Sequence, residues 1–134
     1  NITTNNLKNI TVIDQAVYDK NIDLELFISN KKNKGMSSIY RHSQESGEKE
    51  TVKAIKIDDF VKLNNVPKID LIKLDIEGAE PEVLEDLDFT KYNVGLLCIE
   101  NGIIYKDFLE SKGYKICDAS GYNLMHGNLF FEKL

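Results

Sequence analysis

The sequence predicts an α/β fold, and two observations support this class. Residues 69–75 and 94–100 are near-continuous apolar runs, the composition typical of parallel strands covered on both faces. Between them, residues 80–87 carry apolar side chains at helical spacing, so the three segments form one strand–helix–strand unit. Hydrophobic residues make up 42% and charged residues 29% of the 134 residues, which is ordinary for a single globular domain.

The first half of the chain predicts three strands and a long loop. Residues 10–16, 23–29 and 51–57 contain alternating or β-branched apolar residues, the pattern of strands with one buried side. Residues 30–50 are polar and rich in Lys, Ser and Gly. We expect them to form a loop, of a length that usually serves a function.

The helices have identifiable end signals. Asp58 or Asp59 is expected to cap a short helix. Pro81 suits the first turn of the helix over 80–87. A third helix, residues 103–112, is expected to turn Ile104, Phe108 and Leu109 to one face and to end at Gly113 in a left-handed conformation.

The chain is expected to close with two strands, residues 114–120 and 128–134, joined by a turn. This order resembles the second half of a doubly wound sheet, whose final pair can be antiparallel.

Composition bounds the partners and the compartment. A net charge of −5 and a pI near 5.1 argue against a nucleic-acid surface. No apolar run reaches the roughly 18 to 20 residues of a membrane span, and the polar start is not a signal peptide. Cys98 and Cys117 lie in apolar runs without CxxC spacing, which predicts buried free thiols and a cytoplasmic protein.

Carboxylates follow three of the predicted strands. Asp14, Asp75 and Glu100 each stand at a strand end, where ligands bind in open parallel sheets. If the strands are parallel, these side chains converge on one edge, and Gly78 allows a sharp turn beside Asp75 and Glu77. The chemistry of such a group is divalent-metal ligation or general-base and hydrogen-bonding work.

The acids that follow Asp75 also have a structural interpretation. Glu80 and Glu82 stand at a helix N-terminus, where the helix dipole alone explains them. For Glu77, a functional role at the strand end and a structural role at the helix start both stay open. Lys73 points to the same side of its strand as Asp75, so we expect an ion pair between them.

The polar loop contains a second group of candidates. Residues that can reach across the site as a substrate loop are Ser37, Ser38, Tyr40, Arg41 and His42, and the alternative is a solvated loop without a role.

The stretch D-L-I-K-L-D-I-E-G-A-E, residues 70–80, resembles the hallmark of the FkbM-type S-adenosylmethionine-dependent methyltransferases. The resemblance extends over nearly the whole chain, including the strand at 10–16, the small-residue loop at 35–39 and the closing strands. The family's glycine after the helix is replaced here by Asp86 or Leu87.

The resemblance implies the C-terminal part of a Rossmann-like class I methyltransferase sheet, with helices on its faces and an antiparallel final strand. The implied reaction is methyl transfer to a hydroxyl of a sugar or another small metabolite. Asp14, Gln15 and Ala16 correspond to the end of the family's third strand, where the adenine of S-adenosylmethionine lies.

The resemblance also implies roles at the strand tips. Asp75 and Glu77 correspond to the methyl-transfer centre, with Glu100 supporting them as a catalytic candidate. Some methyltransferases of this class hold a metal at the ends of the same two strands. Asp75, Glu100 and Asn101 resemble that arrangement, although the family need not use a metal.

One part of the family pattern is missing, because no G-x-G loop follows an early strand. We therefore interpret residues 1–134 as a single partial methyltransferase domain, inactive alone, whose exposed sheet edge would favour homo-oligomers. Two alternatives stay open. One is a non-catalytic interaction module that binds no cofactor, and the other is a metal-dependent hydrolase using Asp75, Glu77 and Glu100.

Overall fold

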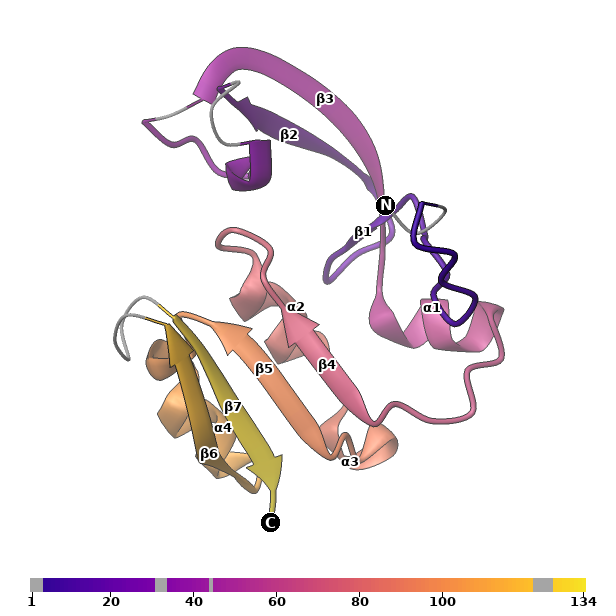
Figure 1. Cartoon of the computed structure of the whole chain (residues 1–134), viewed down its shortest axis with the longest axis vertical. Helices are drawn as coiled ribbons and strands as arrows, with labels where there is room; N and C mark the ends of the chain where they lie inside the picture. The colour runs from indigo at the N-terminus through magenta and orange to yellow at the C-terminus, as the bar shows by residue number, and fades with distance from the viewer. Residues whose placement is uncertain (1–3, 31–33, 44, 122–126) are drawn as a thin grey trace.

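The computed structural model describes residues 4–30, 34–43, 45–121 and 127–134, and it is a mixed α/β structure with two sheets (Figure 1). The first sheet has the strand order β1 (Ala16–Val17), β3 (Glu45–Ile55), β2 (Asp23–Ser29). The second has the order β4 (Leu71–Leu74), β5 (Leu96–Glu100), β7 (Gly127–Lys133), β6 (Tyr114–Gly121). The helices are α1 (Ile57–Leu63), α2 (Glu80–Asp86), α3 (Phe89–Tyr92) and α4 (Lys106–Ser111), with 3-10 turns η1 (Lys34–Met36) and η2 (Gly102–Tyr105).

β2 and β3 form an antiparallel arm that projects away from the second sheet (Figure 1). The predicted bounds of β2 are confirmed, but β3 begins at Glu45, inside the segment expected to be a loop. Its early residues are polar because both faces of the arm are solvated there. Pairing with β2 nevertheless holds them extended, with Lys49 opposite Phe27 and its Nζ 5.0 Å from the Phe27 ring centroid.

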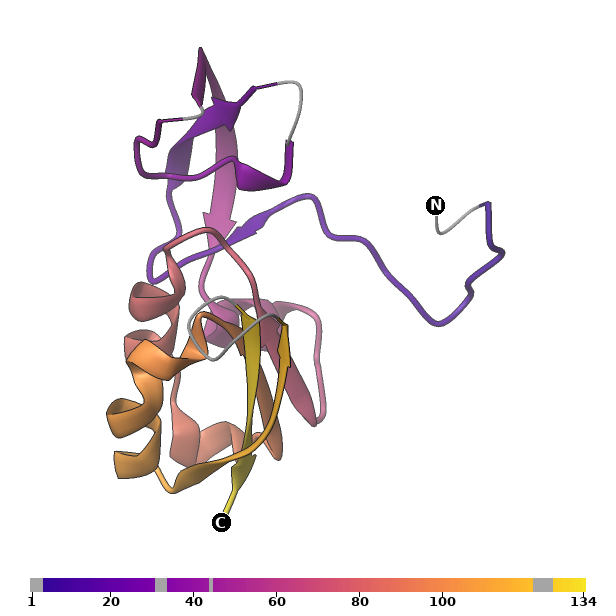
Figure 2. The ribbon, with the colours of Figure 1, turned by 60° about the vertical axis from the view of Figure 1, so that its left-hand side comes forward.

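The strand expected over residues 10–16 is wrong in extent. Only Ala16 and Val17 form β1, parallel to β3. The residues before them run away from the rest of the chain (Figure 2), and Val12 is 72% exposed. A strand needs a neighbour that accepts its backbone hydrogen bonds. Among the described residues β3 pairs only with Ala16, the last residue of this segment, and with Val17 just beyond it.

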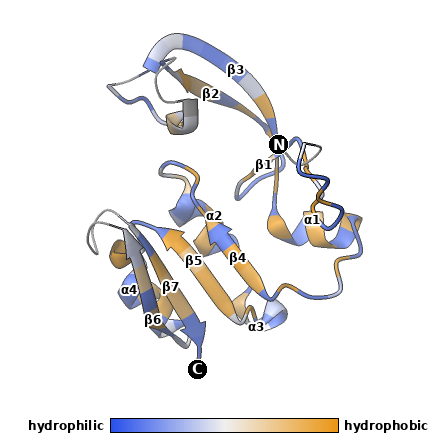
Figure 3. Ribbon diagram, in the orientation of Figure 1, coloured by the Kyte–Doolittle hydropathy of each residue, from blue (hydrophilic) through white to orange (hydrophobic). Residues whose placement is uncertain are grey.

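The second sheet contains the core. β4 and β5 are parallel, as predicted, and β7 lies antiparallel between β5 and β6. Figures 1 and 2 show α2 and α4 against one face of this sheet, and Figure 3 shows apolar residues concentrated along β4 and β5. The fully buried side chains among the described residues are Val83, Leu84, Val94, Leu97, Ile99, Leu109, Tyr114, Leu129 and Phe131.

The expected burial of β4 on both faces does not hold in the described chain. Leu74 is buried, whereas Leu71, which points to the other face, is 50% exposed. Among the cysteines, Cys98 is buried as expected, but Cys117 is exposed because it lies on the outer strand β6.

The start of α1 differs from expectation. α1 begins at Ile57 without a side-chain cap, so neither Asp58 nor Asp59 caps it. Asp58 instead binds Lys62, Lys91 and Tyr92, which ties α1 to α3.

The helix α3 was not predicted. Asp88 begins it by accepting hydrogen bonds from the backbone N–H groups of Thr90 (3.0 Å) and Lys91 (2.9 Å). The helix predicted over 103–112 is split into η2 and α4, which leaves Ile104 66% exposed. Gly113 has the expected left-handed φ of 83°. The expected turn at 121–128 lies mostly outside the described residues, and none of the described helices is long and apolar enough to cross a bilayer.

Candidate functional site

The turn between β4 and α2 positions the first two acids. Gly78 has φ of 103°, so the predicted sharp turn at this glycine is confirmed. Glu77 is also left-handed, with φ of 54°, which is uncommon for a residue with a long side chain. Two successive left-handed residues turn the chain back on itself directly after Asp75.

Glu80 closes this turn from the first position of α2. Its side chain is buried, with 4% of the residue exposed. One carboxylate oxygen accepts a hydrogen bond from the backbone N–H of Ile76 (2.8 Å), and the other accepts from Gly78 (3.0 Å). The helix dipole therefore explains only part of the presence of Glu80, because its carboxylate binds the turn that carries Glu77.

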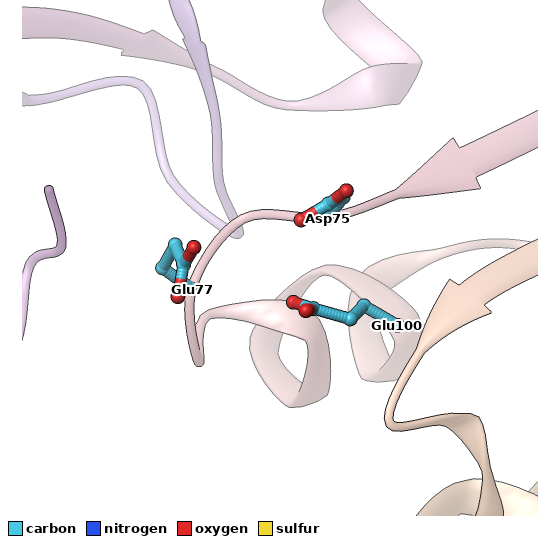
Figure 4. Close-up of side chains that lie close together, drawn as sticks. All are labelled: Asp75, Glu77 and Glu100. Atoms are coloured by element: carbon cyan, nitrogen blue, oxygen red, sulfur yellow. The ribbon is translucent and has the colours of Figure 1, made fainter. Parts of the chain in front are cut away.

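Asp75, Glu77 and Glu100 lie together at the carboxyl ends of β4 and β5. One carboxylate oxygen of each lies within 4.8 Å of the others. Figure 4 shows Glu100 reaching from the end of β5 toward the turn that carries the other two. We call these three residues the acidic group.

The environment of the acidic group favours the protonated form of two members. Burial raises the pKa of Glu100, and the negative charges of Asp75 and Glu77 raise it further. The pKa of Glu77 is raised by burial first and then by Asp75 and Glu80, with His42 acting in the opposite direction.

Lys73 supplies a positive charge beside the acidic group. It forms the predicted ion pair with Asp75, so that prediction is confirmed, and both side chains are about half exposed. Because surface ion pairs are screened by water, the lysine reduces the repulsion within the group without removing it.

The loop before β3 packs against the turn. The Ser38 hydroxyl donates a hydrogen bond to the Glu77 backbone oxygen (2.6 Å), and Ser38 is buried. Ser37 Oγ accepts from the backbone N–H of Ser29 (3.1 Å). Both predicted loop serines therefore bond the protein itself, and His42 lies close enough to Glu77 to affect its pKa.

Tyr40, another residue of the predicted substrate loop, also contacts the turn, but its bond to Glu82 was not predicted. The Tyr40 ring lies over Gly78, and its hydroxyl donates a hydrogen bond to the Glu82 carboxylate. This bond raises the pKa of Tyr40 to about 12. The two residues are 42 positions apart, so their spacing in the sequence contains no signal of the contact.

Two hollows lie near the predicted site residues, and of the two only the first has members of the acidic group in its lining. One, of about 320 Å³, is lined by the turn and the loop together, with Asp75, Glu77, Ser37 and Ser38 among its walls. The other, of about 480 Å³, lies against β2 and β3. The predicted cofactor residues are distributed between them: Gln15 and Ala16 line both, whereas Asp14 lines only the second.

The expected convergence of Asp14 with Asp75 and Glu100 is not observed, because the acidic group of the described chain does not include Asp14. The physical reason is topological. The segment containing Asp14 leads into β1, which pairs with β3 in the first sheet, whereas Asp75 and Glu100 follow strands of the second sheet.

The acidic group has the donor atoms for a hard divalent cation. Mg²⁺ and Ca²⁺ prefer oxygen ligands, and each of the three side chains offers one carboxylate oxygen to a common point. The ion would compete with Lys73 for Asp75. Asn101, the other predicted metal ligand, begins η2 in a left-handed conformation, and its backbone N–H donates to the Gly127 oxygen (2.9 Å).

Comparison with known protein families yields one match. A family model described as a methyltransferase FkbM domain matches residues 4–118, which is most of the chain. Comparisons with curated proteins and with solved structures find no match.

Proposed function

The chain belongs to the FkbM methyltransferase family, and we propose that it forms the acceptor side of an S-adenosylmethionine-dependent O-methyltransferase. The acceptor in this proposal is a hydroxyl of a sugar or another small metabolite. The observation that supports it is the acidic group, which gathers at the ends of two parallel strands beside a hollow of about 320 Å³. Such strand ends are where ligands bind in open α/β sheets.

S-adenosylmethionine, when bound, supplies a methyl group on a positively charged sulfonium. As the acceptor oxygen forms its new bond to the methyl carbon and the carbon–sulfur bond breaks, the hydroxyl must lose its proton. A carboxylate whose pKa is raised accepts a proton more readily at neutral pH than an ordinary one. We assign this role to Glu100, with Asp75 and Glu77 orienting the hydroxyl by hydrogen bonds.

The residues for the donor fit the proposal in part. Gln15 and Ala16 line both hollows, so a molecule held by them would reach the turn at Asp75. The order of β4, β5, β7 and β6 supports a Rossmann-like class I sheet. Because the sequence has no G-x-G loop ahead of Asp14, the proposal assigns the methionine and ribose to polypeptide outside residues 1–134 and expects this chain alone to be inactive.

Calorimetry with S-adenosylhomocysteine on the full-length protein tests the proposal, together with a methyl-transfer assay against a panel of small hydroxyl compounds. We expect Asp75→Ala to keep most of the affinity for S-adenosylhomocysteine and to lose transfer by roughly 100-fold or more. Glu85→Ala, an exposed change on α2, is the matched control and should leave both unchanged.

Failure of the full-length protein to bind S-adenosylhomocysteine would refute the methyltransferase proposal. Tight binding of Mg²⁺ or Mn²⁺ in that case would favour the metal-dependent hydrolase. Absence of both would favour the non-catalytic module.

A further inference from the structure

We propose that Glu80 is a positioning residue: its carboxylate holds the turn at residues 76–78 so that Glu77 is presented to Asp75 and Glu100. The inference relies on the proposed function only for the role of Glu77, which is to orient the acceptor hydroxyl. The geometric part can be tested without any methyl-transfer assay.

The first argument is the burial of the Glu80 carboxylate. A buried carboxylate is costly unless its oxygens are hydrogen-bonded. Glu80 is 4% exposed, and its two oxygens accept from the N–H groups of Ile76 and Gly78. These donors stand on either side of Glu77, so one side chain bonds both neighbours of the residue with the unusual backbone.

The second argument is the backbone of Glu77 itself. A left-handed conformation is unfavourable for a residue with a Cβ atom, so contacts must hold it. Ser38, 39 residues away in the sequence, supplies an independent contact by donating its hydroxyl to the Glu77 backbone oxygen at 2.6 Å. With the backbone bonded on both sides, the Glu77 carboxylate lies beside the other acids (Figure 4).

Glu82 is an internal comparison for the role of Glu80. Both stand in the first turn of α2, where a negative charge is favourable. Glu82, however, binds the Tyr40 hydroxyl and not the turn. If charge at the helix start were the whole role of Glu80, a shorter acid at position 80 would serve equally well.

Amide hydrogen exchange, followed by NMR on the isotope-labelled chain, tests whether the Glu80 carboxylate holds the turn at residues 76–78. Glu80→Asp keeps the charge but is one methylene shorter, so it cannot reach both donors. We expect exchange at Ile76 and Gly78 to accelerate about tenfold to 100-fold, as for loss of a hydrogen bond to a charged group. The amide of Leu97, in the core of β5, should not change. Glu85→Asp, the same shortening of an exposed acid on the same helix, is the matched control and should leave Ile76 and Gly78 unaffected. Equal protection in Glu80→Asp would overturn the positioning role.

Backbone NMR of Glu77 separates positioning from simple stabilisation. A left-handed residue such as Glu77, with φ of 54°, brings its own amide proton close to its Hα and gives a strong nuclear Overhauser effect between them, so this signal should weaken in Glu80→Asp although the charge at position 80 is kept. Ser38→Ala, which changes no charge and loosens the same turn, should act in the same direction and serves if Glu80→Asp does not fold. An unchanged signal in a folded variant would refute the positioning role. Neither measurement depends on donor binding, so failure of the proposed function would not affect them.

Discussion

Glu100→Gln should stabilise this protein at neutral pH, against the usual expectation for a change at a partly buried strand end. The substitution removes one of three negative charges from the acidic group while keeping the shape of the side chain. The amide of the new residue can also donate a hydrogen bond to the carboxylate of Asp75.

The magnitude follows from the distances. Two unit charges 4.8 Å apart interact by about 0.9 kcal/mol in water and about 3.5 kcal/mol at the effective dielectric constant of a partly buried site. Lys73 neutralises part of the charge of Asp75, and the group is partly exposed. We therefore expect a gain near the lower value, about 1 kcal/mol. With roughly 2.1 cal/mol/K of unfolding entropy per residue over 134 residues, this corresponds to a rise in Tm of about 4 °C.

The pH dependence identifies the cause. The pKa of Glu100 in the folded state is raised above its ordinary value of 4.5. A raised pKa contributes stability that is fully present below the ordinary value and is lost as the pH rises through the folded value. Wild type therefore loses this contribution on going to neutral pH, whereas the glutamine variant does not. The difference in Tm between them should be about 4 °C near pH 7 and close to zero near pH 4.

Differential scanning calorimetry across this pH range provides the measurement. Glu85→Gln, the same chemical change on an exposed part of α2, is the control and should leave Tm unchanged at every pH. A lower Tm for Glu100→Gln at neutral pH would refute the reasoning. So would a gain that persists unchanged in acid, because it would then come from packing and not from charge.

Three further changes test other parts of the fold. Asp58→Asn should lower Tm at neutral pH. Hydrogen bonds from Lys62, Lys91 and Tyr92 hold the pKa of Asp58 well below its ordinary 3.8, so the loss of Tm in calorimetric scans should shrink as the pH falls below that value. Gly127→Ala should destabilise by about 1–3 kcal/mol or more in urea unfolding, because its Cβ would lie 2.1 Å from the backbone oxygen of Ser120. Tyr114→Phe should cost about 1–3 kcal/mol in the same assay, because its buried hydroxyl donates to a backbone oxygen at 2.7 Å.

Local signals in the sequence were sufficient where the structure is locally determined. β2 has its predicted bounds because it pairs with β3 from Asp23 to Ser29, with one register shift after Phe27. The parallel pair of β4 and β5 was predictable from two apolar runs joined by a helical segment. Gly78 and Gly113 both take left-handed conformations, as their positions at a turn and a helix end predicted.

The remaining features depend on contacts between distant segments. Residues 45–50 have no apolar pattern, and they are extended only because β2 pairs with them. The apolar pattern at residues 10–15, conversely, finds no strand neighbour among the described residues. The four-residue helix α3 is too short to have a period, although Asp88 two residues before Thr90 is a recognisable cap.

The candidate site divides in the same way. Asp75, Glu77 and Glu100 were predictable as a group, because the ends of parallel neighbours meet at one edge. The contacts of Ser38 with the turn were not, because 39 residues separate it from Glu77. The prediction that Asp14 joins Asp75 and Glu100 was wrong, because the composition of a strand does not show which sheet the strand will join.

The site is built against the stability of the chain, and this supports a functional interpretation of its acids. A left-handed residue that is not glycine follows each of β4 and β5 closely. These residues are Glu77 after β4 and Asn101 after β5. Asparagine tolerates this conformation well and glutamate does not. At the same edge, three carboxylates repel one another. Glycine at position 77 and glutamine at position 100 would relieve both penalties, so stability alone would not select the residues present. Strained backbone and unbalanced charge of this kind concentrate where geometry serves binding or chemistry.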